Sequence, residues 1–514
     1  MNNILSRFYR KKELFYPFLS ALLLGVSRLP LHLNFVVFIA FVPLLIFLQR
    51  FDDRKKVFRA GLIFGFTYTL VCLHWIGLVT VPGLAGIFII ISAYFAILLL
   101  LISKLKTLLP KLHFIIFIFF WLAFEIIQNY LGEFRFAWFN LGYALADYTV
   151  LIQIGEIGGI YLVSLMILII NILLYRIIQT GRYRWRSFLL PMLIVLVWLG
   201  FGIYRYKTIK LVETGKNIGI VQVSIPQHLK WEEEHVQTTL DLYEEYTKAL
   251  AAEQPDLIIW PESALPAYVM REPRFRYFVA DLAQELKTDI FLGFPHYEFA
   301  IDYPQRYKFY NACTRVNKRG VFDALYYKII LVPFGERIPL LSVFPALWDL
   351  QFGQANFEYG TEQAHYDLDG YRYSPLICFE IVFPRLTTQM AQDEVDFIVN
   401  ITNDAWFKRS AGTYQHMVMA KIRAVETRMP VYRAANTGYS VIISARGNIQ
   451  KQTELYEKTT ITHPLEIYDG RSIYTQYLYW LPYIFLAGSL IFIIVGLIFM
   501  IRDRINEQQR GEKQ

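Results

Sequence analysis

Residues 477–501 read YLYWLPYIFLAGSLIFIIVGLIFMI, an apolar run without a single charged side chain. A helix that crosses roughly 30 Å of hydrocarbon needs about 20 mainly apolar residues. The run therefore predicts a transmembrane helix near the C-terminus, and its length makes a buried helix of a soluble domain a poor alternative. Arg502 and Arg504 follow it directly and mark one boundary of the hydrocarbon.

Apolar runs of similar length occur throughout the first part of the chain, separated by short polar connections. The eight predicted spans are residues 14–29, 31–49, 60–80, 84–103, 113–131, 158–179, 187–205 and 477–501. The first span is short and contains Gly25. The pattern predicts a polytopic α-helical membrane bundle.

Composition supports a membrane protein. Of 514 residues, 55% are hydrophobic and only 18% are charged, which excludes intrinsic disorder and argues against an ordinary soluble enzyme. The formal net charge is +8, but the cations form short clusters between apolar runs and do not follow one continuous face. We therefore expect no nucleic-acid partner and interpret the cations as signals of membrane topology.

Lysine and arginine alternate between the two sides of the predicted membrane. One side receives Arg7, Arg10, Lys11, Lys12, Arg50, Arg54, Lys55, Lys56, Arg59, Lys104, Lys106, Lys111, Arg176, Arg182, Arg184, Arg186, Arg502, Arg504, Arg510 and Lys513. The short connections on the opposite side hold only Arg28 and Arg135. Cytoplasmic connections carry the excess of cations, so both termini are predicted to be cytoplasmic. The long segment before the last span then lies outside the cytoplasmic membrane.

That segment, residues 213–470, has the composition of a soluble α/β domain between a membrane domain (1–212) and a final span with a cytoplasmic tail (471–514). Its strand candidates are residues 218–223, 257–260, 290–294, 373–378, 397–402 and 439–444. Helices are predicted over residues 232–254, 274–286, 383–393 and 414–427. Alternation of strands and helices favours a layered sheet with a site near the strand ends.

Three strand ends carry reactive side chains. Glu262 follows Leu257-Ile258-Ile259-Trp260-Pro261, Lys328 lies in Tyr326-Tyr327-Lys328-Ile329-Ile330, and Cys378 closes Ser374-Pro375-Leu376-Ile377. Each has an ordinary structural explanation: a turn carboxylate, a lysine at a strand edge, and a small buried hydrophobe. Together they supply a base, an electrostatic stabiliser and a nucleophile, because a thiol reacts well when a carboxylate takes its proton and a cation favours the thiolate.

The same strand ends belong to a longer ordered set of motifs. The set comprises Val221-Gln222-Val223-Ser224-Ile225-Pro226-Gln227 with Trp231, Trp260-Pro261-Glu262, Tyr310-Asn311, Tyr327-Lys328, Leu331-Val332-Pro333-Phe334-Gly335-Glu336, Ile377-Cys378-Phe379-Glu380, Asn403-Asp404-Ala405-Trp406-Phe407 and Gln415-His416-Met417. With the domain placed between the last two spans, this set resembles the nitrilase (carbon-nitrogen hydrolase) superfamily. Within it, the chain resembles the apolipoprotein N-acyltransferases, the integral membrane branch.

The resemblance implies a nitrilase-like αββα sandwich facing the periplasm of a bacterial inner membrane. It also implies a two-step acyl transfer from a phospholipid to the N-terminal amine of a diacylglyceryl-cysteine apolipoprotein. By position, Cys378 is the nucleophile, Glu262 the general base and Lys328 the stabiliser of the oxyanion. No cofactor or metal is implied.

Other residues receive secondary roles from the same resemblance. Glu336 and Glu380 would support the triad, and Trp231 and Asn311 would help to line the substrate site. Phe379 stands where some relatives carry Tyr, so a role for that hydroxyl is not available here.

A site that acts on lipids is expected to open at the height of the bilayer, because moving an acyl chain into water costs about 0.8 kcal/mol per CH₂. Phe136 and Trp138, after the fifth span, and Trp348, in the apolar segment 344–348, are candidates for that opening. Packing of the domain on the bundle is the alternative explanation for these aromatics.

Several other residues are expected to be structural. His416 is predicted to be a core histidine, and Cys72 and Cys313 buried thiols, since three cysteines at wide spacing form no disulfide or metal pattern. Glu125, within a span, should face the bundle interior or the aqueous boundary.

Two other functions stay open at this point. One is a membrane-anchored amidase or nitrilase that uses the same triad with water as acceptor. The other is a polytopic receptor or transporter with an external binding domain, which would need polar groups along its spans.

Overall fold

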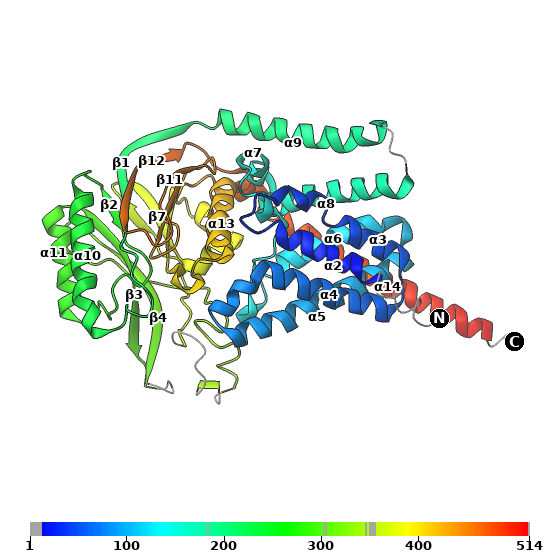
Figure 1. Cartoon of the computed structure of the whole chain (residues 1–514), viewed down its shortest axis with the longest axis horizontal. Helices are drawn as coiled ribbons and strands as arrows, with labels where there is room; N and C mark the ends of the chain where they lie inside the picture. Colours follow the sequence, from blue (N-terminus) through cyan, green and yellow to red (C-terminus); the bar gives the residue numbers. More distant parts are fainter. Residues whose placement is uncertain are drawn as a thin grey trace.

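The computed structural model describes residues 13–181, 185–301, 303, 306–344, 347–348 and 356–511. The predictions for Arg7, Arg10, Lys11, Lys12, Arg182, Arg184 and Lys513 lie outside these residues. Within them the chain forms a helical bundle and a two-sheet domain (Figure 1).

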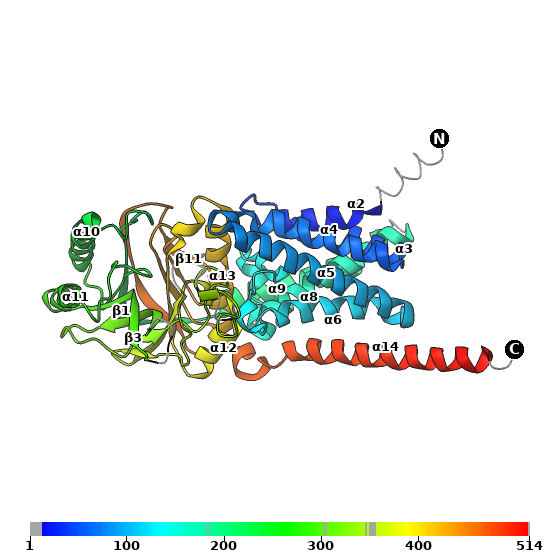
Figure 2. The same cartoon turned by 90° about the horizontal axis from the view of Figure 1, so that it is seen from below.

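Six stretches of the described chain are long and apolar enough to cross a membrane, which makes the protein a multi-pass membrane protein. Their helices are α4 (Arg54–Leu73), α5 (Val81–Leu108), α6 (His113–Ile127), α8 (Gly155–Thr180), α9 (Leu189–Thr208) and α14 (Pro482–Gly511). Five of these helices, α4, α5, α6, α8 and α14, pack side by side, with α14 along one side of the bundle in Figure 2. The sixth helix, α9, runs apart from the others in Figure 1.

The two predicted N-terminal spans are not confirmed as spans. Residues 14–29 form the short helix α2 (Phe15–Val26), and residues 31–49 divide into the 3₁₀ turn η1 (Asn34–Phe38) and the helix α3 (Val42–Arg50). Asn34 is buried and donates to the carbonyl of Ser27 (3.2 Å), and Pro43 opens α3, so polar bonding and proline divide the apolar run. The structure therefore supports six spans and does not confirm eight.

The domain outside the bundle contains two six-stranded sheets. The first sheet has the order β12-β1-β2-β3-β4-β5 and the second β11-β10-β9-β8-β7-β6. The strands are β1 (Leu211–Gln222), β2 (Leu257–Ile259), β3 (Asp289–Phe299), β4 (Tyr307–Val316), β5 (Tyr326–Tyr327), β6 (Tyr366–Leu368), β7 (Tyr371–Ile377), β8 (Phe397–Thr402), β9 (Val431–Ala435), β10 (Val441–Ile443), β11 (Ile449–Gln452) and β12 (Thr459–Tyr468).

Helices cover the outer face of each sheet, giving four layers. The outermost pair is α10 (Glu233–Ala251) and α11 (Pro273–Leu286), and α12 (Pro384–Gln392) and α13 (Ala411–Thr427) lie between the second sheet and the bundle (Figure 1). Apolar side chains such as Ile259, Phe291 and Tyr373 fill the space between the sheets. The predicted α/β sandwich is confirmed.

Buried polar contacts join this domain to the bundle. Gln415 of α13 accepts from the indole nitrogens of Trp75 (3.1 Å) and Trp138 (2.9 Å). Arg428, which caps α13, donates to Glu156 of α8 (2.8 Å), and Arg205 of α9 donates to the same carboxylate at 2.5 and 2.7 Å. The two parts thus share one continuous core, because residues from both belong to a single apolar cluster.

Candidate active site

The three predicted reactive residues follow strands of two different sheets. Glu262 lies three residues beyond β2 and Lys328 directly follows β5, both in the first sheet, whereas Cys378 directly follows β7 in the second. Parallel pairing of β2 with β3 and of β7 with β8 directs strand ends of each sheet toward one edge. The structure brings the three side chains together at that edge.

Glu262 is held by bonds to both of its carboxylate oxygens. Its Oε1 accepts from Asn311 Nδ2 (2.6 Å) and lies 3.8 Å from Lys328 Nζ, and its Oε2 accepts from the backbone N–H of Asn403 (2.7 Å). Only 6% of its surface is exposed. These bonds fix the orientation of the carboxylate beside the pocket described below.

Glu336 completes the charge arrangement around Lys328. Its Oε1 accepts from Lys328 Nζ (2.9 Å) and from Asn311 Nδ2 (3.0 Å), and its Oε2 accepts from the backbone N–H of Val332 (2.9 Å). Asn311 therefore bridges the two carboxylates, and the fully buried Lys328 lies nearer to Glu336 than to Glu262.

Glu380 organises the backbone around the site. Its Oε1 accepts from the Tyr326 hydroxyl (2.8 Å) and from the N–H groups of Ile329 (2.7 Å) and Ile330 (3.1 Å), and its Oε2 accepts from Ile377 N–H (2.8 Å). The carboxylate thereby ties the segment after Lys328 to the strand before Cys378. Burial raises its pKa to about 7, although Lys328 and these donors favour the charged form.

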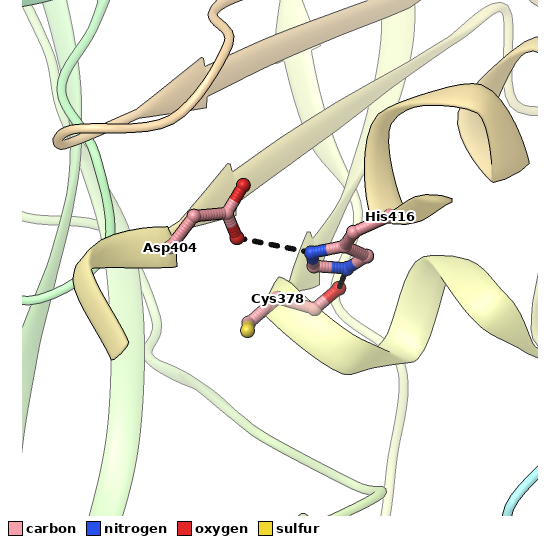
Figure 3. A group of neighbouring side chains, drawn as sticks. All are labelled: Cys378, Asp404 and His416. Atoms are coloured by element: carbon pink, nitrogen blue, oxygen red, sulfur yellow. Dashed lines mark hydrogen bonds and ion pairs between the residues drawn. The ribbon is translucent and has the colours of Figure 1, made fainter. Parts of the chain in front are cut away.

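Cys378 has a left-handed backbone, with φ +51°, at the start of the short turn η8 (Cys378–Val382). His416 Nε2 donates to its carbonyl oxygen (3.0 Å), and in Figure 3 the sulfur points away from the imidazole. Asp404 lies 3.0 Å from His416 Nδ1 and also accepts from Arg433 Nη2 (2.8 Å). His416 thus contacts the backbone of Cys378 and not its thiol.

Cys378, Asp404 and His416 place one potential metal-ligand atom each within 4.8 Å of one another. The donor set does not suit a cation, however, because the guanidinium of Arg433 already neutralises Asp404, and the Thr402 hydroxyl donates to the same carboxylate (2.9 Å). Arg433 holds the pKa of Asp404 well below its usual range against the effect of burial. We interpret the cluster as a hydrogen-bond network.

Burial and opposed charges set the protonation of the reactive groups. Burial and Glu262 raise the pKa of the Cys378 thiol while Lys328 lowers it, and the net direction is upward. Burial and Glu336 also raise the pKa of Glu262, against Lys328. Burial opposes the charge on Lys328, but Glu336 and Glu262 hold the pKa of its ammonium above the usual value. The resting thiol is therefore protonated, and a base is needed to activate it.

A cavity of about 300 Å³ opens beside Cys378 and continues into the helical bundle. Its polar end contains Glu262, Glu336, Cys378, Asn403 and His416. The rest of the lining is mostly apolar and comes from Trp75, Ile76, Val79, Thr80, Gly83, Ile87, Ile90, Ile91, Tyr94, Phe124, Gln128, Leu131, Phe134, Phe136, Trp138, Val332, Pro333, Phe334, Gly335, Phe379, Trp406 and Phe407. Helices α5 and α6 thus line the same cavity as Glu262 and Cys378, whereas the fully buried Lys328 lies behind its wall.

The predicted aromatic residues divide into two groups. Phe136, Trp138 and Phe379 line the cavity, and Trp138 stacks on Phe379 with ring centres 6.3 Å apart. Trp231 is 49% exposed and Trp348 packs edge-on against Tyr303 at 5.3 Å, and the structure places neither in the lining of the cavity. Pro345 and Ala346 of the segment 344–348 lie outside the described residues.

Residue types alone did not indicate the network of His416, Asp404 and Arg433, nor the buried Lys230. His416 is buried and hydrogen-bonded, as predicted, but its contact with the Cys378 carbonyl depends on the packing of α13 against η8. Cys72 and Cys313 are buried free thiols, and Glu125 is buried within the bundle, as expected.

Comparison with known proteins agrees with this architecture. The carbon-nitrogen hydrolase family model matches residues 217–473, and the model of the apolipoprotein N-acyltransferase N-terminal domain matches residues 20–173. An amidase from Nesterenkonia sp. shares 15% identity, with a TM-score of 0.39, over 50% of this chain and 92% of that chain. The two family models identify a carbon-nitrogen hydrolase domain joined to the N-terminal domain of the apolipoprotein N-acyltransferases.

Relatives that match over most of both chains narrow the family. The apolipoprotein N-acyltransferase of Geobacter metallireducens is 34% identical over 89% of this chain and 90% of its own length. That of Chlorobaculum tepidum is 27% identical over 96% of this chain and 97% of its own length. The chain belongs to the apolipoprotein N-acyltransferase family, and it is an N-acyltransferase.

Proposed function

We propose that this protein transfers an acyl chain from a phospholipid to the N-terminal amine of a diacylglyceryl-cysteine apolipoprotein, through a thioester on Cys378. The observation that carries the proposal is the single cavity that joins the thiol and carboxylates to apolar side chains of α5 and α6. A fatty chain placed there stays among apolar groups while its ester carbonyl reaches the sulfur. An amidase acting on a small soluble substrate has no need of such a channel.

In the first half-reaction, Glu262 takes the thiol proton and the Cys378 sulfur attacks the ester carbonyl. A carbon–sulfur bond forms, the ester carbon–oxygen bond breaks, and the proton passes from Glu262 to the leaving oxygen of the lysophospholipid. Lys328 stabilises the oxyanion, and losing one such donor typically slows the step about 100- to 1000-fold. Glu336 keeps this ammonium charged and Asn311 keeps both carboxylates in register.

In the second half-reaction, the acceptor amine attacks the thioester. A carbon–nitrogen bond forms and the carbon–sulfur bond breaks. Glu262 accepts the amine proton and passes it to the departing sulfur, which restores the Cys378 thiol and the Glu262 carboxylate. The two acyl carriers use one nucleophile in turn, so the kinetics are ping-pong.

The distribution of Lys and Arg supports an orientation with both termini in the cytoplasm and the catalytic domain on the opposite side of the membrane. Membership of the family supports a bacterial inner membrane, which places this domain in the periplasm. In this orientation the cavity reaches the outer half of the bilayer. Phospholipid donors and lipoprotein acceptors are both held there, so neither fatty substrate has to cross water.

The decisive experiment follows the acyl group on the enzyme. Purified protein in detergent is incubated with phospholipid labelled in its acyl chain, and we expect a hydroxylamine-labile label on the Cys378 peptide. Cys378→Ser should carry no such label. Release of the label only on addition of a lipopeptide amine supports a transferase, whereas release by water alone supports a hydrolase. Absence of label on the wild type would contradict the proposal.

A further inference from the structure

Lys230 is a fully buried lysine that the proposed mechanism does not use. It lies in the turn between β1 and α10, where its backbone N–H donates to the carbonyl of Pro226 (3.1 Å). Its side chain is 0% exposed, and within the described part of the chain its Nζ has no hydrogen-bond partner. Burying an ammonium without a partner is unfavourable, so its presence needs an explanation.

The turn that carries Lys230 is tied to the base of the site. Gln227 accepts a hydrogen bond from the Asn403 side chain (2.7 Å), and the Asn403 backbone N–H donates to Glu262 Oε2 (2.7 Å). Asn436 fixes the start of the same turn, because its side chain bonds both the N–H and the carbonyl of Ile225 at 3.0 and 2.8 Å. The position of Lys230 relative to Glu262 is thus built into the fold.

Glu262 is the carboxylate whose charge acts on Lys230. Burial lowers the pKa of Lys230 to about 8, and Glu262 acts in the opposite direction. The lysine therefore carries its charge through most of the neutral range.

The charges around Glu262 explain why a second ammonium is useful. Two carboxylates, Glu262 and Glu336, face one ammonium, Lys328, which lies 2.9 Å from Glu336 but 3.8 Å from Glu262. The thiols of Cys378 and Cys313 also interact with Glu262, and Asp404 is already paired with Arg433. Without a further cation, the charge of Lys328 stabilises the nearer Glu336 more than Glu262, and burial then favours the protonated form of Glu262.

We propose that Lys230 is a positioning residue that acts through Glu262: its buried charge keeps this carboxylate ionised and ready to take the proton of Cys378. The inference rests on the role of Glu262 in the proposed function. Lys230 itself touches no reacting atom.

The test measures the reactivity of the thiol without a lipid substrate. Alkylation of Cys378 by iodoacetamide is followed from pH 5 to pH 9 by mass spectrometry of the Cys378 peptide, in wild type, Lys230→Met, Lys230→Gln and Lys230→Arg. The rise of the alkylation rate with pH on the acid side of the pH–rate profile, called the acid limb below, reports the ionisation of Glu262. Removing a nearby positive charge favours the protonated acid, so both neutral variants should move this limb upward by about one pH unit. Lys230→Arg should keep the limb of the wild type.

Lys421→Met serves as the matched control. Lys421 is also a buried lysine, 5% exposed, but it lies on α13 and the carboxylate that acts on it is Asp147. Its replacement should leave the limb unchanged.

An unchanged limb in both neutral variants would overturn the inference, and so would an equal loss of rate at every pH. Failure of both neutral variants to fold would also overturn the inference. A charge on Lys230 that serves only to keep Glu262 ionised is not needed for the stability of the fold. The experiment separates this inference from the proposed function. A shifted limb in a protein that never acquires an acyl label supports the role of Lys230 and rejects the acyl transfer. An unshifted limb in a protein that does acquire the label rejects the role of Lys230 and supports the acyl transfer.

Discussion

Cys378 and Ser263 both have left-handed backbones, with φ +51° and +47°, and Ser263 directly follows Glu262. Such conformations cost a non-glycine residue about 1–3 kcal/mol and persist only where neighbours impose them. At Cys378 the hydrogen bond from His416 to the carbonyl is one such constraint. Left-handed backbone thus occurs at Cys378 and directly after Glu262, two residues that line the cavity.

His416 should make stability depend on pH. Burial and Arg433 lower its pKa below the ordinary value of 6.5, so the folded ring stays neutral where the unfolded chain takes up a proton. A base with a lowered folded pKa contributes stability above its unfolded pKa, and that contribution is lost as pH falls below it, by about 1.4 kcal/mol per pH unit.

The measurement is thermal unfolding in detergent at pH 7 and pH 5. His416→Gln keeps a side-chain donor but does not titrate, so its melting temperature should fall less between the two pH values than that of the wild type. Equal falls in both proteins would show that His416 does not titrate in this range.

Glu262, Lys328 and Cys378 could be selected as candidates from the sequence, because each lies at the end of an apolar run that predicts a strand. Lys230 could not, because a lysine beside Trp231 looks like a surface residue until its burial is known. The same holds for Arg433, a charge in the central strand β9 that argues against a strand until Asp404 is placed beside it.

Among the elements, α5 links membrane and site most directly. Ile87, Ile90, Ile91 and Tyr94 follow the helical repeat and face the cavity. Thr80 caps the helix by accepting from Gly83 N–H (3.3 Å), which fixes where this face begins. Under the proposed function, this face therefore sets how deep an acyl chain on Cys378 can extend.

Filling this face should shorten the acyl chain that the protein accepts. Ile87→Trp adds bulk inside the cavity, and displacing two CH₂ groups of a long chain costs about 1.6 kcal/mol, or more than tenfold in labelling rate. Labelling of Cys378 by donors with long and short chains should show the loss only for the long one. Ile89→Trp, on the same helix but 71% exposed and outside the cavity lining, is the control. Equal effects of both variants would contradict the proposed path of the chain.

Element boundaries show where sequence patterns fail. Strand β8 coincides with its predicted residues, 397–402, since an unbroken apolar run has one interpretation. Strand β12 was not predicted, because it is largely polar, contains Pro464 and lies at a sheet edge. The predicted second span is not confirmed for the opposite reason: its apolar composition hid the buried polar contact of Asn34.

At the scale of the whole molecule, Glu156 forms a buried ionic contact between the bundle and the domain. It receives Arg428 from the catalytic domain and Arg205 from α9, and it is almost fully buried on α8. Removing one partner of a buried ion pair leaves an uncompensated charge and typically costs about 3–5 kcal/mol.

Glu156→Gln should therefore lower the melting temperature markedly. Lys248→Gln, which removes an exposed pair with Glu244 and Glu285, is the control and should leave it unchanged. Thermal unfolding in detergent distinguishes the two. A melting temperature of Glu156→Gln equal to that of the wild type would show that the ion pairs of Glu156 are not needed to hold the domain on the bundle.

The sulfur is delivered by one sheet, and its proton acceptor and ammonium by the other. The apolar layer between the sheets consequently sets the distance between the Cys378 sulfur and the Glu262 carboxylate. A shift of one sheet relative to the other by a fraction of a bond length would move Cys378 away from Glu262, although no residue of the triad is replaced. Substitutions hidden in that layer can thus silence the enzyme from a distance, by spoiling alignment alone.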